Sequence, residues 1–341
     1  MPGPIDAVLA VTYRCNSRCT MCNIWQAEPQ DEDEITHYRR LPPSLRSINV
    51  SGGEPFLRGD LPAIIAAIKT QCRRGQIIIS SNGLQPQRIR KLGQQILRLD
   101  PGIGVGVSID GIGEVHDRIR GVSGAYERAL ESVRVLQELG CTNLRLAYTA
   151  TQGNAGQMVR VYNLANELGV QFTCAVAHSS DHYFGTDDTV VPDGELLDEE
   201  LKRLSSSELR SSSPKRWLRS YFTSGLRHFV AHGRRPLPCD AGRDFFFMSP
   251  RGDIYPCNIR DEVMGNLRES NFSTLWTSDQ ANRVRAAIAG CSICWMICTA
   301  RTAIRRHPLQ IGWWILANKA RGHLEDESSI EAPGRISGRI P

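Results

Sequence analysis

Residues 6–22 read DAVLAVTYRCNSRCTMC, an apolar run that leads directly into three closely spaced cysteines. A short apolar run of this kind is typical of a buried strand, so the loop that follows it begins at the edge of a sheet. Cys15, Cys19 and Cys22 have the spacing C-x3-C-x2-C, which lets three thiolates converge on one point above that edge. The stretch therefore predicts a metal site at the end of the first strand.

Three cysteines are one ligand short of a complete iron-sulfur site. A [4Fe-4S] cube is usually held by four thiolates, so a three-cysteine loop leaves one iron open to bind and activate another molecule. A zinc knuckle or three incidental thiols are the competing interpretations. Zinc needs a fourth Cys or His nearby, and none lies between Asn23 and Thr36. We therefore expect a cluster with one open iron.

Five further strand candidates follow the first, and helical stretches separate them. The six candidates cover residues 6–13, 47–53, 77–83, 104–111, 143–151 and 170–177. Strands that alternate with amphipathic helices indicate βα units and a parallel sheet. Six units are fewer than the eight of a closed TIM barrel, so we expect an α/β fold with a partial, open (β/α)6 TIM-like barrel. In such a fold the site lies at the C-terminal ends of the strands.

The pattern changes beyond the sixth strand candidate. Residues 1–185 hold the alternation, and residues 186–238 are polar and helical. Within them the stretch SSSELRSSSPKR at 205–216 indicates a flexible or loop-rich segment. Residues 239–324 hold five of the eleven cysteines, and residues 325–341 are polar with Gly and Pro. We therefore expect a barrel core, a helical connector, a small cysteine-rich domain and a disordered tail.

The second strand candidate ends in the segment SGGEP. Gly52 and Gly53 let the backbone come close to a ligand, and Glu54 can accept a hydrogen bond from an ammonium group. Ser81, at the end of the third strand, can face the same ligand, although a simple Ser-Asn-Gly turn explains it equally well. A glycine pair alone also indicates only a turn, so its position at a strand end after the cysteine loop is what favours a binding site.

The fourth strand candidate ends in Ser108-Ile109-Asp110-Gly111, and Arg120 follows in the segment HDRIRG. This combination offers a hydroxyl for a ribose and a guanidinium for a carboxylate. A surface charge is the alternative for Arg120, because most arginines are exposed. We expect Ser108, Asp110 and Arg120 to belong to the same binding site as the glycine pair.

Together these motifs resemble those of the radical S-adenosylmethionine (SAM) superfamily, whose signature is C-x3-C-x-φ-C with φ usually aromatic. Met21 takes the φ position here, and its flexible thioether can fill the space beside the adenine. The segment GGEP is similar to the family motif that holds the SAM amino group, and SxDG…HDxxRG is similar to a pattern of the peptide- and metabolite-modifying branch. The resemblance implies that a reduced [4Fe-4S] cluster cleaves SAM to a 5'-deoxyadenosyl radical, which removes hydrogen from a substrate.

A second group of cysteines lies in the last third of the chain. Cys239 is followed by Cys257 and by Cys291-x2-Cys294-x3-Cys298, with the hairpin-like SPRGDIYPC between the first two. This region resembles the SPASM and shorter twitch extensions of radical SAM enzymes, which implies one auxiliary [4Fe-4S] cluster held by Cys239, Cys257, Cys291 and Cys294. A structural zinc ribbon is the alternative. Cys298 is left over as a replacement ligand, a buried thiol or a hydrogen-atom donor.

Composition limits the partners of the chain. Its net charge of +5, from 41 basic and 36 acidic side chains, is too small for 341 residues to indicate nucleic-acid binding. No stretch reaches the roughly 20 apolar residues of a membrane span, and the first residues lack the pattern of a signal peptide. We expect a cytoplasmic protein. Residues 308–324 are apolar with a basic end and are expected to pack on the protein, with an interfacial helix as the alternative.

The predicted activity is that of a radical SAM oxidoreductase or maturase that oxidises or epimerises a small metabolite or sugar-like substrate. The first strand candidate begins within ten residues of the start, so no peptide-recognition domain is expected before the barrel, which favours a small substrate. A peptide-modifying maturase is the alternative, and a non-catalytic zinc-binding scaffold is the alternative from another class. The resemblance also implies an external one-electron donor such as a flavodoxin or ferredoxin.

Overall fold

A computed structural model describes residues 3–27, 32, 34–186 and 194–325 of the chain. Within these residues one sheet of nine strands has the order β6-β5-β4-β3-β2-β1-β7-β8-β9. The first six strands are parallel neighbours in chain order. The strands are β1 (Asp6–Thr12), β2 (Ser47–Gly52), β3 (Gln76–Ser81), β4 (Gly104–Ser108), β5 (Leu144–Ala150), β6 (Gln171–Val176), β7 (Phe245–Met248), β8 (Asp253–Tyr255) and β9 (Gly265–Asn266). The predicted α/β fold with a partial, six-unit barrel is confirmed.

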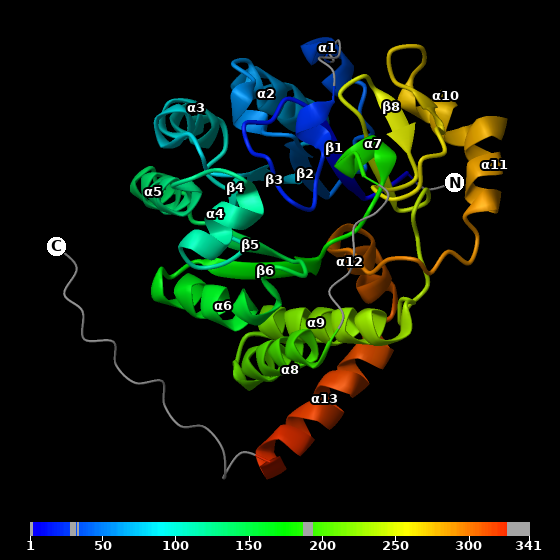
Figure 1. Cartoon of the computed structure of the whole chain (residues 1–341). Helices are drawn as coiled ribbons and strands as arrows, with labels where there is room; N and C mark the ends of the chain where they lie inside the picture. The colour runs from blue at the N-terminus through cyan, green and yellow to red at the C-terminus, as the bar shows by residue number, and fades with distance from the viewer. Residues whose placement is uncertain (1–2, 28–31, 33, 187–193, 326–341) are drawn as a thin grey trace.

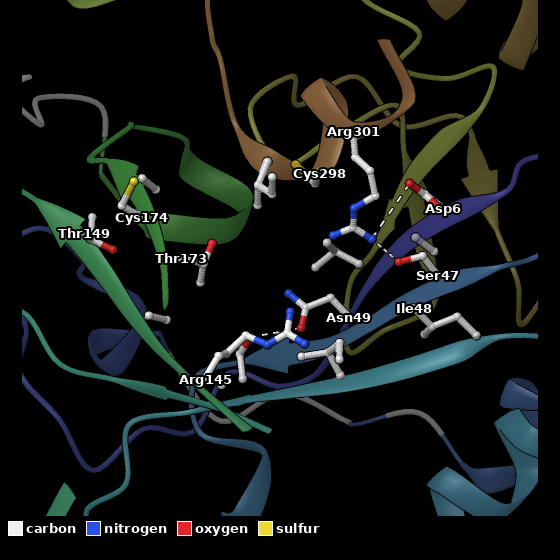
Figure 2. A pocket seen from close by; sticks show the side chains of 18 of the residues that line it. Asp6, Ser47, Ile48, Asn49, Arg145, Thr149, Thr173, Cys174, Cys298 and Arg301 are labelled. Atoms are coloured by element: carbon white, nitrogen blue, oxygen red, sulfur yellow. Dashed lines mark hydrogen bonds and ion pairs between the residues drawn. The ribbon is translucent and has the colours of Figure 1, made fainter. Parts of the chain in front are cut away.

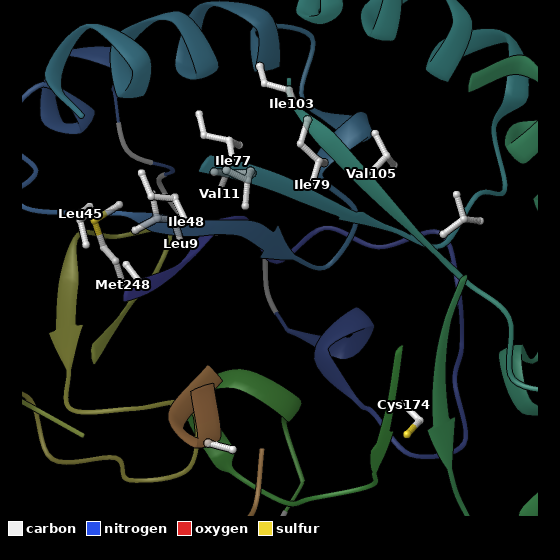
Figure 3. Packing of buried hydrophobic residues seen from close by; sticks show 14 of the residues in the cluster. Leu9, Val11, Leu45, Ile48, Ile77, Ile79, Ile103, Val105, Cys174 and Met248 are labelled. Atoms are coloured by element: carbon white, nitrogen blue, oxygen red, sulfur yellow. The ribbon is translucent and has the colours of Figure 1, made fainter. Parts of the chain in front are cut away.

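Helices cover the outer face of the sheet (Figure 1). In Figure 3 the side chains of Ile48, Ile77 and Ile79 lie between the strands and these helices, where they belong to the main hydrophobic core. The helices of this half are α1 (Ile35–Tyr38), α2 (Leu61–Gln71), α3 (Pro86–Leu99), α4 (Glu114–Arg120), α5 (Ala125–Glu138), α6 (Met158–Glu167) and α7 (Asp181–Phe184), with the 3-10 turns η1 (Ile24–Gln26), η2 (Pro55–Leu57) and η3 (Ala155–Gln157). Burial of the outer face holds the strands in register, so that their C-terminal ends form one rim.

The inner face of the barrel leaves space and carries polar side chains among apolar ones. Successive side chains of a strand point to opposite faces, and in β5 Leu144 and Leu146 enter the outer core whereas Arg145 and Thr149 line an inner cavity. Small or polar side chains of other strands line it as well: Asn49, Ser80, Gly106 and Thr173. A TIM barrel fills this position with layers of bulky branched side chains. The inside of this barrel is therefore open to a ligand.

Strand β7 joins the cysteine-rich region directly to the barrel. It pairs in parallel with β1, from Asp6 opposite Phe245 to Leu9 opposite Met248, and it turns back into β8 as an antiparallel hairpin. The turn contains Gly252 with a φ of 82°, a left-handed conformation that favours glycine. The hairpin predicted from SPRGDIYPC is therefore present, while the boundaries between barrel core, connector and cysteine-rich domain stay a prediction.

Most of the serine-rich stretch at 205–216 is helical, so its prediction as a flexible or loop-rich segment is wrong except at residues 211–213. Helix α8 (Glu195–Arg210) includes residues 205–210, and α9 (Pro214–His232) begins three residues later. Leu197, Leu201 and Leu204 of α8 are buried in the core, and α8 packs closely on α9. Tertiary packing of an amphipathic face supplies most of the stability of a helix, and here it outweighs the weak helix preference of serine.

The C-terminal helices are α10 (Phe272–Thr277), α11 (Asp279–Ala287), α12 (Ile297–Arg306) and α13 (Pro308–Glu325). One face of α13 packs on α8 and α9, where Ile311 and Ile315 are buried, as predicted. The other face exposes three large apolar side chains: Leu309, Trp313 and Leu316. In the described part of the chain no helix is long and apolar enough to cross a membrane, whereas the cytoplasmic location stays a prediction. The predicted disordered tail lies, from residue 326 on, outside the described residues.

Helix α9 contacts the cysteine-rich region through a glycine. A Cβ added to Gly225 would lie 2.3 Å from Nε1 of the buried Trp295, which donates a hydrogen bond of 2.9 Å to the carbonyl oxygen of Phe222. We predict that Gly225→Ala lowers the melting temperature of the anaerobically purified protein, because overpacking costs about 1–3 kcal/mol against a gain in helix propensity of about 1 kcal/mol.

The matched control is Gly312→Ala in α13, where an added Cβ meets nothing within 4 Å. This variant should keep or raise the melting temperature, measured by circular dichroism. Equal shifts for the two variants would contradict the packing of Trp295 on Gly225.

Candidate functional site

The cysteine loop docks on the C-terminal end of α4. The backbone amide of Arg18 donates to the carbonyl oxygen of Arg120 at 2.9 Å, and the hydroxyl of Ser17 donates to the same oxygen at 3.0 Å. Gly121, which follows, has a left-handed φ of 63°, and a Cβ there would lie 2.3 Å from the carbonyl oxygen of Arg18. The end of the segment HDRIRG is thus shaped to receive the loop.

The three thiols of the loop are partly buried and close enough to affect one another. Burial raises the pKa of Cys15 to about 12 and that of Cys22 to about 11, and the neighbouring Cys19 raises both. A metal reverses this effect, because a coordinating thiol is deprotonated outright. Thiols whose ionisation is opposed by burial and by a neighbouring thiol, as for Cys15 and Cys22, therefore fit a cationic cluster. Among the described residues no three His, Cys, Asp or Glu side chains meet as ligands of one metal ion, so the convergence of the three thiolates stays a prediction.

Polar groups of the barrel rim reach the sulfurs of the loop. Nη1 of Arg120 donates to Sγ of Cys19 at 3.6 Å, and Nδ2 of Asn82 donates to Sγ of Cys15 at 3.8 Å. Hydrogen bonds to cysteine sulfurs tune the reduction potential of iron-sulfur clusters. Both the thiols and the hydrogen-bond donors Arg120 and Asn82 therefore fit a bound cluster.

A buried ion pair positions Arg120. Its Nη2 lies 2.5 Å from Oδ2 of Asp110, which is 0% exposed. Oδ1 of Asp110 accepts a hydrogen bond of 2.8 Å from the backbone amide of Thr149, and His116 accepts one from the backbone amide of Asp110 at 2.9 Å. Burial raises the pKa of the Asp110 carboxyl, and Arg120 opposes this shift. Asp110 is therefore enclosed by protein and acts on the site by orienting Arg120.

Glu54 connects the ends of β2 and β3. Its carboxylate accepts hydrogen bonds from the backbone amide of Phe56 at 3.0 Å, the hydroxyl of Ser81 at 3.0 Å and the backbone amide of Asn82 at 2.6 Å. Burial raises the pKa of Glu54 to about 7, and these hydrogen bonds oppose the shift. The contact with an ammonium group predicted for Glu54 stays a prediction.

The two glycines of SGGEP allow a close approach between two backbone segments of the protein. A Cβ on Gly52 would lie 2.1 Å from the carbonyl oxygen of Thr12, and a Cβ on Gly53 would lie 2.3 Å from that of Arg14. The backbone amide of Gly53 donates to Thr12 at 2.8 Å. The glycines thus bring the end of β2 against the chain that enters the cysteine loop, while their contact with a ligand stays a prediction.

Met21 and Ser108 are both partly buried near this rim. Met21 lies in the turn between Cys19 and Cys22, and Ser108 ends β4 opposite Ala147 of β5. The structure thus places the predicted residues of the first site at the C-terminal ends of β1 to β4 or in the loops that follow, except Arg120, which ends α4. Direct contacts join Arg120 to Cys19 and Ser81 to Glu54.

The second cysteine group shows two different sulfur environments. Sγ of Cys257 accepts hydrogen bonds from the backbone amides of Ile259 at 3.4 Å and Arg260 at 3.3 Å, a pattern that favours a thiolate. Sγ of Cys298 instead donates to Oδ1 of Asn258 at 3.6 Å and lines the inner cavity of the barrel. Burial raises the pKa of both thiols, and for Cys257 the two backbone amides oppose the shift. The role of Cys257 as a cluster ligand stays a prediction.

Arg235 lies beside the other cysteines of this group. Burial raises the pKa of Cys239 to about 11 and also raises that of Cys294, while the charge of Arg235 opposes both shifts. Its guanidinium stacks 5.3 Å from the ring of Trp295 and is itself buried. With Cys291 nearby, this group fits a bound cluster in the same way as the first.

The inner cavity holds side chains that the sequence reasoning missed. It has a volume of about 190 Å³, and Figure 2 shows Arg145 and Arg301 entering it from opposite walls. Asn49 lies between them in this view and accepts a hydrogen bond of 2.9 Å from Ser80. One signal was available: Arg145 interrupts the apolar strand LRLAYTA, and an arginine in a buried strand needs a polar partner or a ligand.

Comparison with known proteins agrees with this geometry. A family model of the radical SAM superfamily matches residues 9–154, and a model of an iron-sulfur cluster-binding domain, SPASM, matches residues 239–298. The chain belongs to the radical SAM superfamily. Its cofactors are accordingly SAM and a [4Fe-4S] cluster, with an auxiliary cluster in the SPASM domain.

Curated relatives of this radical SAM enzyme include two kinds of enzyme. Pre-heme d1 synthase of Dinoroseobacter shibae is 26% identical over 89% of this chain and 82% of its own length. PqqA peptide cyclase of Xanthomonas axonopodis pv. citri is 26% identical over 82% of this chain and 76% of its own length. The radical SAM enzyme is thus similar to a heme-type synthase and to a peptide cyclase over most of its length.

Solved structures share the fold. SuiB of Streptococcus suis bound to S-adenosylmethionine superposes with a TM-score of 0.62 at 16% identity, over 83% of this chain and 67% of that chain. Native anSMEcpe with bound AdoMet and a peptide gives a TM-score of 0.62 at 14% identity, over 93% of this chain and 100% of that chain. At these identities the likeness concerns the fold alone.

The buried ion pair at the barrel rim leads to a stability prediction for this radical SAM enzyme. We predict that Asp110→Asn lowers the free energy of unfolding by about 3–5 kcal/mol, because it leaves Arg120 buried without its counter-charge. Asp198→Asn is the control, since Asp198 pairs with Arg227 on the exposed surface and such pairs contribute about 0.2–1 kcal/mol. Anaerobic urea denaturation measures both, and a loss for Asp110→Asn as small as the control's would contradict the account.

Proposed function

We propose that this radical SAM enzyme removes hydrogen from a small, polar substrate held inside the partial barrel. The observation that carries the proposal is the cavity of about 190 Å³ between the inner faces of the strands and α12. Ligand pockets are commonly about 300–1,000 Å³, so this cavity suits a small molecule or one substituent of a larger one. Because the six barrel strands are parallel, their C-terminal ends all lie on the side of the barrel where the cysteine loop is.

The residues of the rim have separate roles in this proposal. Cys15, Cys19 and Cys22 hold the cluster that SAM completes at its open iron. When bound, the reduced cluster and SAM supply one-electron cleavage of a carbon-sulfur bond and hydrogen abstraction. Arg120, fixed by Asp110, donates to Sγ of Cys19 and offers its charge to the SAM carboxylate.

The ends of β2 to β4 and the cysteine loop form the remaining SAM contacts in the proposal. Gly52 and Gly53 hold the loop in place by close backbone approach, and Glu54 receives the SAM amino group. Ser81 keeps the Glu54 carboxylate in position through its hydroxyl. Ser108 contacts the ribose, and the thioether of Met21 packs beside the adenine.

Four cysteines hold the auxiliary cluster in this proposal: Cys239, Cys257, Cys291 and Cys294. The hydrogen bonds to Cys257 and the charge of Arg235 support this assignment. Cys298 remains a thiol at the cavity wall. A flavodoxin- or ferredoxin-like protein supplies the electron, as is required for a cluster that must be reduced before SAM is cleaved.

A peptide is the second candidate substrate. The similarity to PqqA peptide cyclase over 82% of this chain favours it. The names of other relatives, pre-heme d1 synthase and AdoMet-dependent heme synthase, point instead to heme-type substrates. A peptide or a tetrapyrrole exceeds the cavity and would place only one side group in it. The small-molecule proposal and these two differ in how much of the substrate enters the barrel.

Replacing the loop cysteines tests the cluster assignment. We predict that the combined Cys15→Ala, Cys19→Ala and Cys22→Ala variant loses SAM cleavage and that its iron content falls from about eight to about four per chain, since each [4Fe-4S] cube holds four irons. Elemental analysis and chromatographic detection of 5'-deoxyadenosine after dithionite reduction measure the two effects.

The matched control is the Cys72→Ala, Cys141→Ala variant, which alters buried thiols of the outer core and should keep both iron and cleavage. Unchanged cleavage in the loop variant, or zinc in place of iron in the wild type, would refute the assignment.

The substrate class is tested by deuterium transfer. Reduced enzyme and SAM are incubated with pools of deuterated sugars and carboxylic acids, with deuterated peptides, and with a deuterated tetrapyrrole. We predict deuterium in 5'-deoxyadenosine only with a small-molecule pool. Transfer from the peptides or the tetrapyrrole alone would replace the first proposal with one of the others.

A further inference from the structure

The inner cavity holds an arginine without an acidic partner. Arg145 reaches the cavity from the inner face of β5. Its Nη2 donates to Oδ1 of Asn143 at 2.6 Å, and its buried Nε has no hydrogen-bond partner. Among the described residues no carboxylate forms an ion pair with Arg145. An anion would balance the charge of this partly buried guanidinium and accept a hydrogen bond from its free N–H group.

Neutral amides connect Arg145 to two further cations. Nε2 of Gln171 donates to Oδ1 of Asn143 at 3.2 Å, and Oε1 of Gln171 accepts hydrogen bonds from Lys215 and Arg219 at 2.6 Å each. The group thus gathers three positive charges at the N-terminal ends of β5 and β6 without a carboxylate inside the network. Glu208 lies outside this network, and its charge raises the pKa of Arg219.

The charges of this network oppose one another. Burial lowers the pKa of Arg145 to about 10, and the charges of Arg219 and Arg301 lower it further. Burial lowers the pKa of Lys215 and of Arg219 as well. Folding therefore holds these cations together at a cost, which a bound anion would offset.

The arginine on the opposite wall of the cavity already has an acidic partner. Arg301 of α12 donates to the hydroxyl of Ser47 and lies 4.0 Å from Oδ2 of Asp6. Asp6 also pairs with Arg305 at 3.1 Å, so the acid that lines the cavity is shared by two arginines. Figure 2 shows this ion pair on one side of the cavity and Arg145 on the other. Of the two arginines that line the cavity, Arg301 thus has an acidic partner, and Arg145 has none among the described residues.

We propose that Arg145 binds an oxyanion of the substrate, a carboxylate or a phosphate, inside the barrel. Asn49 and Thr173 line the same cavity and offer further hydrogen bonds. This inference rests on the proposed function, in which the substrate enters the barrel. An anion held at the N-terminal ends of the strands directs the rest of the substrate toward their C-terminal ends, where the cysteine loop lies. The site thus sets both the substrate class and its orientation.

Anion binding by the holoenzyme tests this site directly. The anaerobically purified protein is titrated calorimetrically with inorganic phosphate and, separately, with acetate. We predict saturable binding of at least one of these anions at one site per chain, and weakening by roughly 10- to 100-fold in Arg145→Gln, because the variant loses a charge-assisted pair. Tighter binding of phosphate indicates a phosphorylated substrate, and tighter binding of acetate indicates a carboxylic acid.

Two further variants control for charge and for folding. Arg90→Gln removes the same charge from the exposed surface of α3, where Arg90 pairs with Glu138, and should bind the anion as the wild type does. Arg145→Lys keeps the charge and loses the planar fork of the guanidinium, so its affinity should lie between those of the wild type and Arg145→Gln. Should Arg145→Gln fail to fold, a weakened Arg145→Lys with the native melting temperature supports the site, and an unweakened one overturns it.

The proposed function is tested separately on the wild type by dithionite-driven cleavage of SAM. Absence of cleavage would overturn the proposed function, and the titration would still decide whether Arg145 binds an anion. Equal affinities in the wild type and folded Arg145→Gln, or no saturable binding of either anion, would overturn the anion site and leave the proposed function in place.

Discussion

The buried ion pair between Asp110 and Arg120 is the interaction on which the geometry of the site depends. Nη2 of Arg120 and Oδ2 of Asp110 are 2.5 Å apart in the protein interior. Two opposite charges buried in this way must compensate each other. Through it the end of β4 fixes the end of α4, and the carbonyl oxygen of Arg120 in turn binds the backbone of the cysteine loop at Arg18. Arg120 also reaches Sγ of Cys19. One pair therefore connects the barrel frame to the cluster ligands.

The strand order and the rim could be predicted from the sequence because both follow from local patterns. Apolar runs, amphipathic helices and strand-end polar motifs are properties of neighbouring residues, and Cys15 to Cys22 carry their own spacing. The inner cavity could not be predicted in this way. Arg145 and Arg301 are 156 positions apart (301 − 145), and only the pairing of β7 with β1 brings α12 over the barrel. The helix over 205–210 was missed for the same reason, because its stability comes from packing on α9.

The second cysteine group forms part of the wall of the inner cavity. Cys298 lines the cavity. Cys239 and Cys294 raise the pKa of Cys298 and also that of Cys257, so these four thiols lie close to one another. The sequence left the role of Cys298 open, and in the structure its thiol donates to Asn258, whereas the sulfur of Cys257 accepts from backbone amides. The SPASM domain thus contributes Cys298 to the lining of the inner cavity of the barrel.

The central claim is that the three-cysteine loop leaves one iron open for SAM. The electron paramagnetic resonance spectrum of the reduced, anaerobically purified protein, recorded with and without SAM, tests it most directly. The account predicts two [4Fe-4S] signals, of which one changes when SAM is added because SAM binds the open iron. Signals that are all unaffected by SAM would contradict the claim.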